Sequence, residues 1–221
     1  IKKRLRMDTS QVIINEERPQ LTKHLATRFK EKIGQNVNLL GEVVLGNGEA
    51  DHRYHHYLEA LESPDINYIS VKISGIYAQT HALNYEESFP ELVSRMSALY
   101  QKAIDFPYTD EDGIKRSKFI NLDMEEYKDA HFTLRLFKAV LNLPQFKNYS
   151  AGIVVQAYLP DAYDFQTELL EFAKARVDGG GAPIKMRLGK GCNLEKETVI
   201  TSLKGWPNPI RPSKTEVDAN Y

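Results

Sequence analysis

Apolar residues follow two alternating patterns along this chain. In residues 18–33 (RPQLTKHLATRFKEKI) they recur every four positions, which predicts an amphipathic helix. The next segment, residues 37–46 (VNLLGEVVLG), is a short apolar run ending at glycine and predicts a buried strand. We therefore expect an N-terminal helical arm over residues 1–36 and a main domain over residues 37–221.

The strand-then-helix order repeats through the main domain. After the first run, strand-like segments recur at YISVKISGI (68–76), FINLDM (119–124), GIVVQAY (152–158) and IKMRLGKG (184–191). A helix-like segment follows each of them, giving five units in a row. Strands that alternate with helices predict βαβ units and parallel strands. The strands are nearly continuous apolar runs, which is typical of strands buried on both faces.

Polar residues at the strand ends distinguish two architectures that fit this order, an open doubly wound sheet and a closed (β/α)8 barrel. In a barrel, catalytic groups from several strand ends converge on one mouth, whereas a doubly wound sheet gathers ligands at its switch point. The polar residues at these ends are Glu42, Lys72, Asp123, Gln156, Arg187 and Lys190. A complete barrel takes about 250 residues and eight strands. We therefore predict an α/β fold, a (β/α)8 TIM-type barrel of which this chain carries about five βα units.

Composition narrows the class of protein further. The chain has 221 residues, 42% of them hydrophobic, which is enough for one sizeable core. It has 29 basic against 30 acidic residues, so it lacks the basic bias expected for nucleic-acid binding. A single cysteine, Cys192, cannot form an internal disulfide and favours a reducing compartment. No segment approaches the roughly 20 apolar residues of a membrane helix. These features predict a cytoplasmic protein without nucleic-acid contact.

Two charged residues at strand ends are candidates for chemistry. Lys72 lies within an apolar strand, where an amine costs desolvation energy unless it is paired or functional. It can reach solvent, bind a carboxylate or act as a Schiff-base nucleophile. Asp123 follows Leu122 at the end of a strand. It can cap the next helix, take part in a site, or do both. Glu125 and Glu126 favour the dipole of that helix rather than chemistry.

Gln156 and the segment RLGKGCN are candidates for ligand contacts. The Gln156 amide both donates and accepts, which suits a heteroaromatic ring with alternating C=O and N–H groups, or a plain backbone contact. In RLGKGCN, Gly189 and Gly191 let the backbone approach a ligand closely. Arg187 and Lys190 can meet phosphate or an anionic ring. As a motif, a lone G-x-G is weak.

The histidines do not predict a metal centre. His52 and His56 stand four apart on one predicted helix, but the H-E-x-x-H pattern is missing and this helix lies outside the barrel. Cys192 has no histidine near it in sequence, so we interpret it as a packing residue.

The strand-end segments together resemble the proline dehydrogenase family, in particular the proline dehydrogenase barrel of bifunctional bacterial proline-utilisation flavoenzymes. The resemblance rests on NLLGEVVL, YISVKIS, INLDMEEY, GIVVQAYLPDA and IKMRLGKG, in this order. The tail KTEVDANY resembles a later family motif. The similarity runs from about Val37 to Tyr221 and is specific because each motif lies on its own strand.

The resemblance implies a barrel that binds FAD at its mouth and oxidises L-proline to 1-pyrroline-5-carboxylate, on the way from proline to glutamate. It implies that Lys72 and Asp123 are catalytic, that Lys72 holds the proline carboxylate, and that Glu42 pairs with a substrate-binding arginine. The FAD-binding residues that it implies are Asp123, Gln156, Arg187, Gly189, Lys190, Gly191 and Lys214. It implies no metal.

The resemblance also suggests partners and departures. It implies a quinone as electron acceptor, a fused or partner pyrroline-5-carboxylate dehydrogenase domain, an oligomer, and a cytoplasmic location or a peripheral one at the inner face of the membrane. Gly189 stands where the family has a branched residue, and Asn193 and Leu194 replace two aromatics. The family's paired arginines would follow Tyr221, so we expect the isolated segment to be inactive. Alternatives are a Schiff-base lyase or aldolase barrel using Lys72 or Lys190, and a truncated non-catalytic barrel.

Overall fold

Within the described residues, five parallel strands form the central sheet. A computed structural model describes residues 18–39, 44, 46–78, 80 and 82–221, together with the isolated residues 4 and 14. The strands lie in the order β1-β2-β5-β6-β7. Their bounds are Val37–Asn38 (β1), Tyr68–Val71 (β2), Phe119–Leu122 (β5), Gly152–Gln156 (β6) and Lys185–Gly189 (β7). Neighbours in the sheet follow chain order, as in the wall of a (β/α) barrel. The predicted α/β fold with parallel strands is confirmed.

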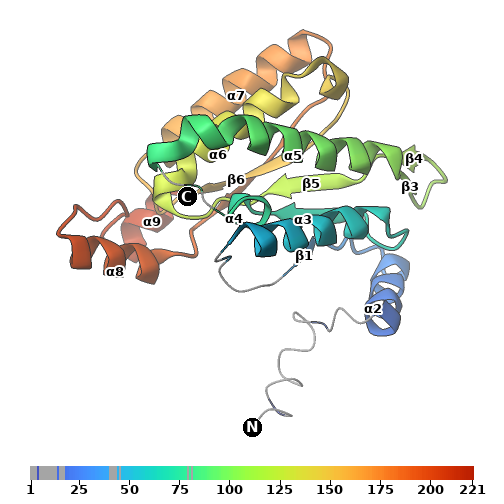
Figure 1. The fold of residues 1–221 in the computed structure, drawn as a ribbon, viewed down its shortest axis with the longest axis horizontal. Helices are drawn as coiled ribbons and strands as arrows, with labels where there is room; N and C mark the ends of the chain where they lie inside the picture. Colours follow the sequence, from blue (N-terminus) through green and yellow to red (C-terminus); the bar gives the residue numbers. More distant parts are fainter. Residues whose placement is uncertain are drawn as a thin grey trace.

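Helices connect the strands and cover one face of the sheet (Figure 1). The α-helices are α2 (Arg18–Lys30), α3 (Asn47–Glu62), α4 (Ile73–Ile76), α5 (Tyr85–Asp105), α6 (Ala130–Leu141), α7 (Ala162–Asp178), α8 (Leu194–Lys204) and α9 (Lys214–Asn220). The part of the chain that the structure describes also has 3-10 turns at η1 (Ala82–Asn84), η2 (Tyr127–Asp129) and η3 (Pro144–Phe146). None of the helices in the described part of the chain is long and apolar enough to cross a bilayer. The predicted helix at residues 18–33 is confirmed and ends at Lys30. The division of the chain at residue 36 stays a prediction.

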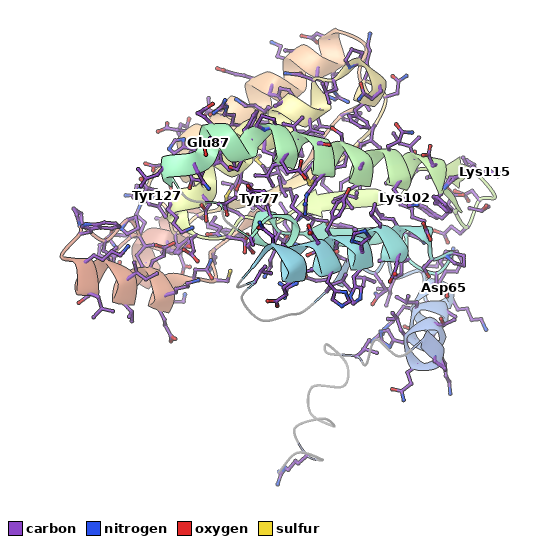
Figure 2. The ribbon with its side chains drawn as sticks, in the orientation of Figure 1. Asp65, Tyr77, Glu87, Lys102, Lys115 and Tyr127 are labelled. Atoms are coloured by element: carbon purple, nitrogen blue, oxygen red, sulfur yellow. The ribbon has the colours of Figure 1, made fainter. Side chains whose placement is uncertain are left out.

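A small antiparallel hairpin lies at the opposite end of the sheet from α8 (Figure 1). Its strands are β3 (Tyr108–Thr109) and β4 (Lys115–Arg116). In the turn, the Asp110 Oδ1 atom accepts backbone N–H groups from Asp112 and Ile114, and Gly113 adopts a positive φ of 79°. Figure 2 places Lys115 of this hairpin far from Tyr127, which follows the carboxyl end of β5. The sequence analysis did not predict this hairpin, although the letters DEDG are a turn signal.

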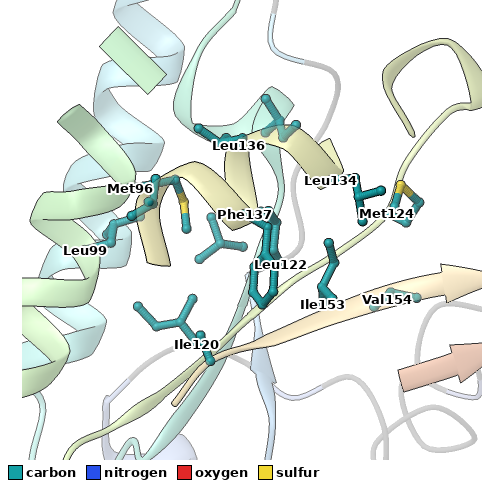
Figure 3. Packing of buried hydrophobic residues seen from close by; sticks show 14 of the residues in the cluster. Met96, Leu99, Ile120, Leu122, Met124, Leu134, Leu136, Phe137, Ile153 and Val154 are labelled. Carbon is teal, nitrogen blue, oxygen red and sulfur yellow. The ribbon is translucent and has the colours of Figure 1, made fainter. Parts of the chain in front are cut away.

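Alternate residues of the inner strands form the apolar core. The side chains of Ile69, Ile120, Leu122 and Ile153 are fully buried. Figure 3 shows Leu122 and Ile153 beside Phe137 of α6. Fully burying one such aliphatic side chain stabilises the fold by about 1.5–3 kcal/mol. The core therefore lies between the sheet and its covering helices.

The other face of the sheet is polar, although β2, β5 and β6 are largely buried on both faces. Ser70 and Asn121 are fully buried, and they alternate with the core residues along β2 and β5. The prediction of burial is confirmed for these strands, whereas β7 is only half-buried. The Ser70 hydroxyl and the Asn121 Nδ2 group are tolerated there because both donate to Asp123. The buried Asn121 Oδ1 atom has no hydrogen-bond partner within the described residues.

The helix after β5 begins later than predicted. The sequence pattern suggested a helix directly after the strand, but η2 begins at Tyr127 and α6 at Ala130. Asp129 occupies the N-cap position of α6. Residues 123–126 are consequently a loop, and the alternative of Asp123 as a helix cap is wrong. The same shift removes Glu125 and Glu126 from the first turn of the helix.

Candidate active site

The carboxyl ends of all five described strands of the central sheet open into one cavity of about 500 Å³. Lys72 follows β2, Asp123 follows β5, and Gln156 and Arg187 lie on β6 and β7. The remaining lining residues are Asn38, Arg53, Ser74, Met124, Glu125, Glu126, Val154, Gly189, Gly191, Cys192, Asn193 and Lys196. This volume lies in the range of small-molecule and cofactor sites. Glu42 lies outside the described residues.

Asp123 is the centre of a polar network on the polar face of the sheet, opposite the covering helices. Its Oδ1 atom accepts hydrogen bonds from Ser70 Oγ at 3.2 Å and Asn121 Nδ2 at 2.8 Å. The same oxygen pairs with Arg187 Nη2 at 2.7 Å. Ser70 in turn accepts from Asn36 Nδ2 at 2.9 Å. Charge-assisted bonds of this kind are the stronger ones, so Asp123 holds the Arg187 guanidinium at the cavity.

Lys72 presents a cation to the cavity. Tyr57, a buried side chain of α3 whose pKa burial raises to about 12, lies beside the turn that follows, with its hydroxyl 3.0 Å from where a Cβ at Gly75 would lie. The Lys72 carbonyl accepts from the Gly75 N–H at 3.0 Å. Among the described residues, the Lys72 ammonium has no ion-pair partner. A backbone held by the α4 turn, with an ammonium that has no ion-pair partner in the described residues, suits the binding of an anion.

Gln156 has one half of its amide bonded and the other half free. The Nε2 atom donates to the carbonyl of Met124 at 2.8 Å. The Oε1 atom is buried and has no hydrogen-bond partner within the described part of the chain. An unpaired buried acceptor costs about 1–3 kcal/mol, and a ligand N–H group in the cavity would remove this cost.

Gly189 ends β7 and Gly191 lies in the turn that follows, and only Gly191 must be glycine. Gly191 has a φ of 124°, and an added Cβ would lie 2.2 Å from the ring of Tyr158. Only glycine fits this position. At Gly189 an added Cβ would meet no atom within 4 Å. The close approach at Gly191 is therefore to Tyr158, and Gly189 leaves open space in the cavity.

Lys190 and Lys214 converge on one carboxylate. Their ammonium groups pair with Asp218 at 2.5 and 2.6 Å. The hydrogen bond from Lys190, followed by that from Lys214, lowers the pKa of Asp218. Because its ammonium is engaged, Lys190 is a poor candidate for a Schiff-base nucleophile. The roles of both lysines in cofactor binding stay predictions.

The sequence analysis missed several polar residues of this site. They are Asn36, Ser70, Ser74 and Asn121, which bond to the predicted residues, to Glu125 or to one another. Glu125, interpreted from the sequence as a helix-dipole residue, and Asn193, named only as a departure from the family, also join this network. The available signal was a pair of polar residues two positions apart at each strand end, Ser70 with Lys72 and Asn121 with Asp123.

The histidines of α3 form a ring pair and not a larger cluster. The rings of His52 and His56 have centroids 4.2 Å apart. Within the described ranges, no group of three or more histidine, cysteine or acidic side chains is arranged to hold a metal ion.

Polar groups from successive strand ends around one cavity define the class: an α/β domain of the (β/α) barrel type with a site at its carboxyl-end mouth. The sequence profile of the proline dehydrogenase family matches residues 21–221. This chain belongs to the proline dehydrogenase family. No curated protein sequence matches it significantly.

Solved structures agree with this assignment. Proline utilization A from Corynebacterium freiburgense is 42% identical, with a TM-score of 0.89 over 98% of this chain. Proline utilization A from Bdellovibrio bacteriovorus, inactivated by N-propargylglycine, is 32% identical, with a TM-score of 0.77 over 90% of this chain. A variant of the Bradyrhizobium japonicum protein is 24% identical over 84% of the chain, has a TM-score of 0.70 and shows the fold alone. The chain spans 22% of the length of the first two proteins and 19% of the third.

Proposed function

We propose that this chain forms part of a flavin-dependent proline dehydrogenase that oxidises L-proline to 1-pyrroline-5-carboxylate. The observation that carries the proposal is the convergence of Lys72, Asp123, Gln156 and Arg187 on one cavity. It is supported by membership of the family over residues 21–221.

The donor set of the cavity fits a flavin. The buried Oε1 atom of Gln156 lacks a partner among the described residues and suits a ring N–H group. Arg187, held by Asp123, supplies a cation near the same strand ends. The residues that would hold FAD are Asp123, Gln156, Arg187, Gly189, Lys190, Gly191 and Lys214. When bound, FAD supplies the acceptor for the hydride that leaves the carbon beside the ring nitrogen of proline.

Lys72 fits the binding of the substrate carboxylate. Its ammonium lies in the cavity without a protein counter-ion in the described part of the chain. A carboxylate fixed by a cation orients the ring of proline, and orientation is a large part of the catalytic effect. Glu42 is proposed to pair with a substrate-binding arginine, and its structure lies outside the described residues.

The similarity to proline utilization A suggests the wider setting of the reaction. We propose a quinone as electron acceptor, a fused or partner pyrroline-5-carboxylate dehydrogenase domain, an oligomeric protein, and a cytoplasmic or peripheral membrane location. The Bdellovibrio bacteriovorus protein is inactivated by N-propargylglycine, and we propose that the same compound inactivates this one.

The proposal is tested with the purified native protein. We expect bound flavin by absorbance, and loss of the oxidised flavin band when L-proline is added without oxygen, with 1-pyrroline-5-carboxylate as product. Lys72→Met should raise the KM for proline roughly 30-fold or more, because truncating one partner of a bound charge pair costs about 2–5 kcal/mol. A protein without flavin, whose Lys72 is instead trapped by borohydride with a carbonyl substrate, would refute the proposal in favour of a Schiff-base enzyme.

A further inference from the structure

The loop after β5 carries a carboxylate that bonds to the neighbouring strand end. Glu125 Oε2 accepts the backbone N–H of Ser74 at 3.0 Å, and Oε1 accepts the Ser74 hydroxyl at 2.7 Å. Ser74 lies in the first turn of α4, which begins directly after Lys72. Lys72, in the N-cap position, makes no side-chain capping bond to that turn. Glu125 therefore supplies the cap that α4 lacks.

The backbone of Glu125 bonds to the other half of the cavity. Its carbonyl accepts from Asn193 Nδ2 at 2.9 Å, and from Gln156 Nε2 at the longer distance of 3.4 Å. One residue thus joins the end of β2, the end of β6 and the loop between β7 and α8. The bonds span 51, 31 and 68 residues of sequence.

We propose that Glu125 is a positioning residue that fixes Lys72 relative to Gln156. Its contacts then form a brace, meaning the hydrogen bonds of Glu125 to Ser74, Gln156 and Asn193, that holds the substrate-binding and cofactor-binding sides of the cavity together. The proposal rests on the function proposed above. The direction of the Lys72 side chain depends on its backbone, which the α4 turn holds through the Gly75 N–H bond to the Lys72 carbonyl. Without Glu125, the turn keeps its fold but loses two bonds that fix its orientation.

Hydrogen exchange tests the brace without any ligand. In the native protein, Glu125→Ala should speed amide exchange at Ser74 tenfold or more, because its N–H loses its acceptor. Ser74→Ala keeps the N–H bond and should speed exchange less. The control is Glu86→Gln, which changes an exposed carboxylate paired with Arg135. Unchanged exchange in Glu125→Ala would overturn the proposal, whatever the activity of the protein.

Steady-state kinetics test the consequence for the site. Glu125→Ala should raise the KM for proline tenfold or more and leave kcat within about threefold, with flavin content retained. Glu125→Gln keeps a carbonyl acceptor and should recover part of the KM. The double variant with Ser74→Ala should be no worse than Glu125→Ala, because Ser74→Ala removes only a bond that Glu125→Ala has already removed. If Glu125→Ala raises KM but also lowers flavin content and melting temperature, and Glu125→Gln rescues none of them, the role of Glu125 is merely structural and the proposal is overturned. A wild-type protein that does not oxidise proline would refute the proposed function. The hydrogen-exchange result would still show whether Glu125 holds the turn at Ser74.

Discussion

The two ends of the sheet use the same strands for different purposes. At the carboxyl ends, Lys72 and Gln156 keep polar atoms without protein partners in the described part of the chain. At the amino ends, the rings of Tyr68 and Phe119 pack edge-on at 5.0 Å. The Lys185 ammonium lies 5.5 and 5.7 Å from their centroids. The polar side chains at the carboxyl ends line the larger cavity, whereas these three side chains at the amino ends contact one another.

This difference indicates that the carboxyl ends of the strands serve function and the amino ends serve stability. Strands β2 and β5 each begin with an aromatic residue, Tyr68 and Phe119, and lead into a site residue, Lys72 and Asp123. In barrel enzymes the carboxyl ends serve catalysis and the amino ends serve stability. Substitutions at the carboxyl ends should therefore change activity more than stability, and those at the amino ends the reverse.

The largest effect is expected for Asp123→Ala. It removes the acceptor shared by Ser70, Asn121 and Arg187. We expect kcat/KM for proline to fall by roughly 30-fold to several thousand-fold, which corresponds to about 2–5 kcal/mol. Asp123→Asn, which keeps one acceptor oxygen, should fall less. A loss of activity that follows thermal unfolding alone would erase the contrast between the two ends.

Lys118 gives the matching test at the amino ends. Just before β5, it is buried and donates to the carbonyl of Ser63. Desolvation lowers its pKa from 10.5 to about 8. Between pH 8 and 10.5 the unfolded chain then binds more protons than the folded one, so stability contributed by this group rises with pH, by up to about 3 kcal/mol.

The measurement is the free energy of unfolding of wild type and Lys118→Met at pH 7 and at pH 10. Wild type should gain stability relative to the variant as pH rises, while proline kinetics at pH 7 stay unchanged. A gain that appears in the opposite direction, or a strong loss of activity, would contradict the division of roles.

Of the two glycines after Arg187, only Gly191 should be sensitive to substitution by alanine. Gly191→Ala brings a Cβ to 2.2 Å from Tyr158 at a φ of 124°, and backbone strain of this kind costs about 1–3 kcal/mol before the clash is counted. We expect a lower melting temperature and weaker flavin binding. Gly189→Ala meets open space and should keep the melting temperature, which differential scanning fluorimetry will show. Equal effects would mean that the turn is not held by Tyr158.

The smallest effect is expected for Lys185→Met. A cation over aromatic faces contributes about 0.5–1 kcal/mol at an exposed site. Chemical denaturation should detect this loss of stability, with proline kinetics unaltered. A change in KM would place Lys185 within the site and blur the distinction between the two ends.

The sequence predicted the strand ends well and the network between them poorly. Apolar runs such as GIVVQ are readable because a buried strand needs them, so Lys72, Asp123 and Gln156 were found by position. Ser70 and Asn121 were missed because a polar residue within a strand looks the same whether it faces solvent or a buried partner.

The role of Glu125 could not be predicted because it depends on contacts across the fold. Its bond to Ser74 spans 51 residues of sequence. The sequence instead suggested a helix dipole contact, and that helix begins only at Ala130. Local patterns carry no information about which distant backbone N–H group a carboxylate will meet.

The flavin affinity of Gln156→Leu tests the central claim most directly. The claim is that the cavity at the carboxyl ends binds a flavin ring through the free Oε1 atom of Gln156. Titration of the apoprotein with FAD, followed by flavin fluorescence, should give a dissociation constant at least tenfold higher for the variant, with a melting temperature of the apoprotein close to wild type. An unchanged dissociation constant would contradict the account.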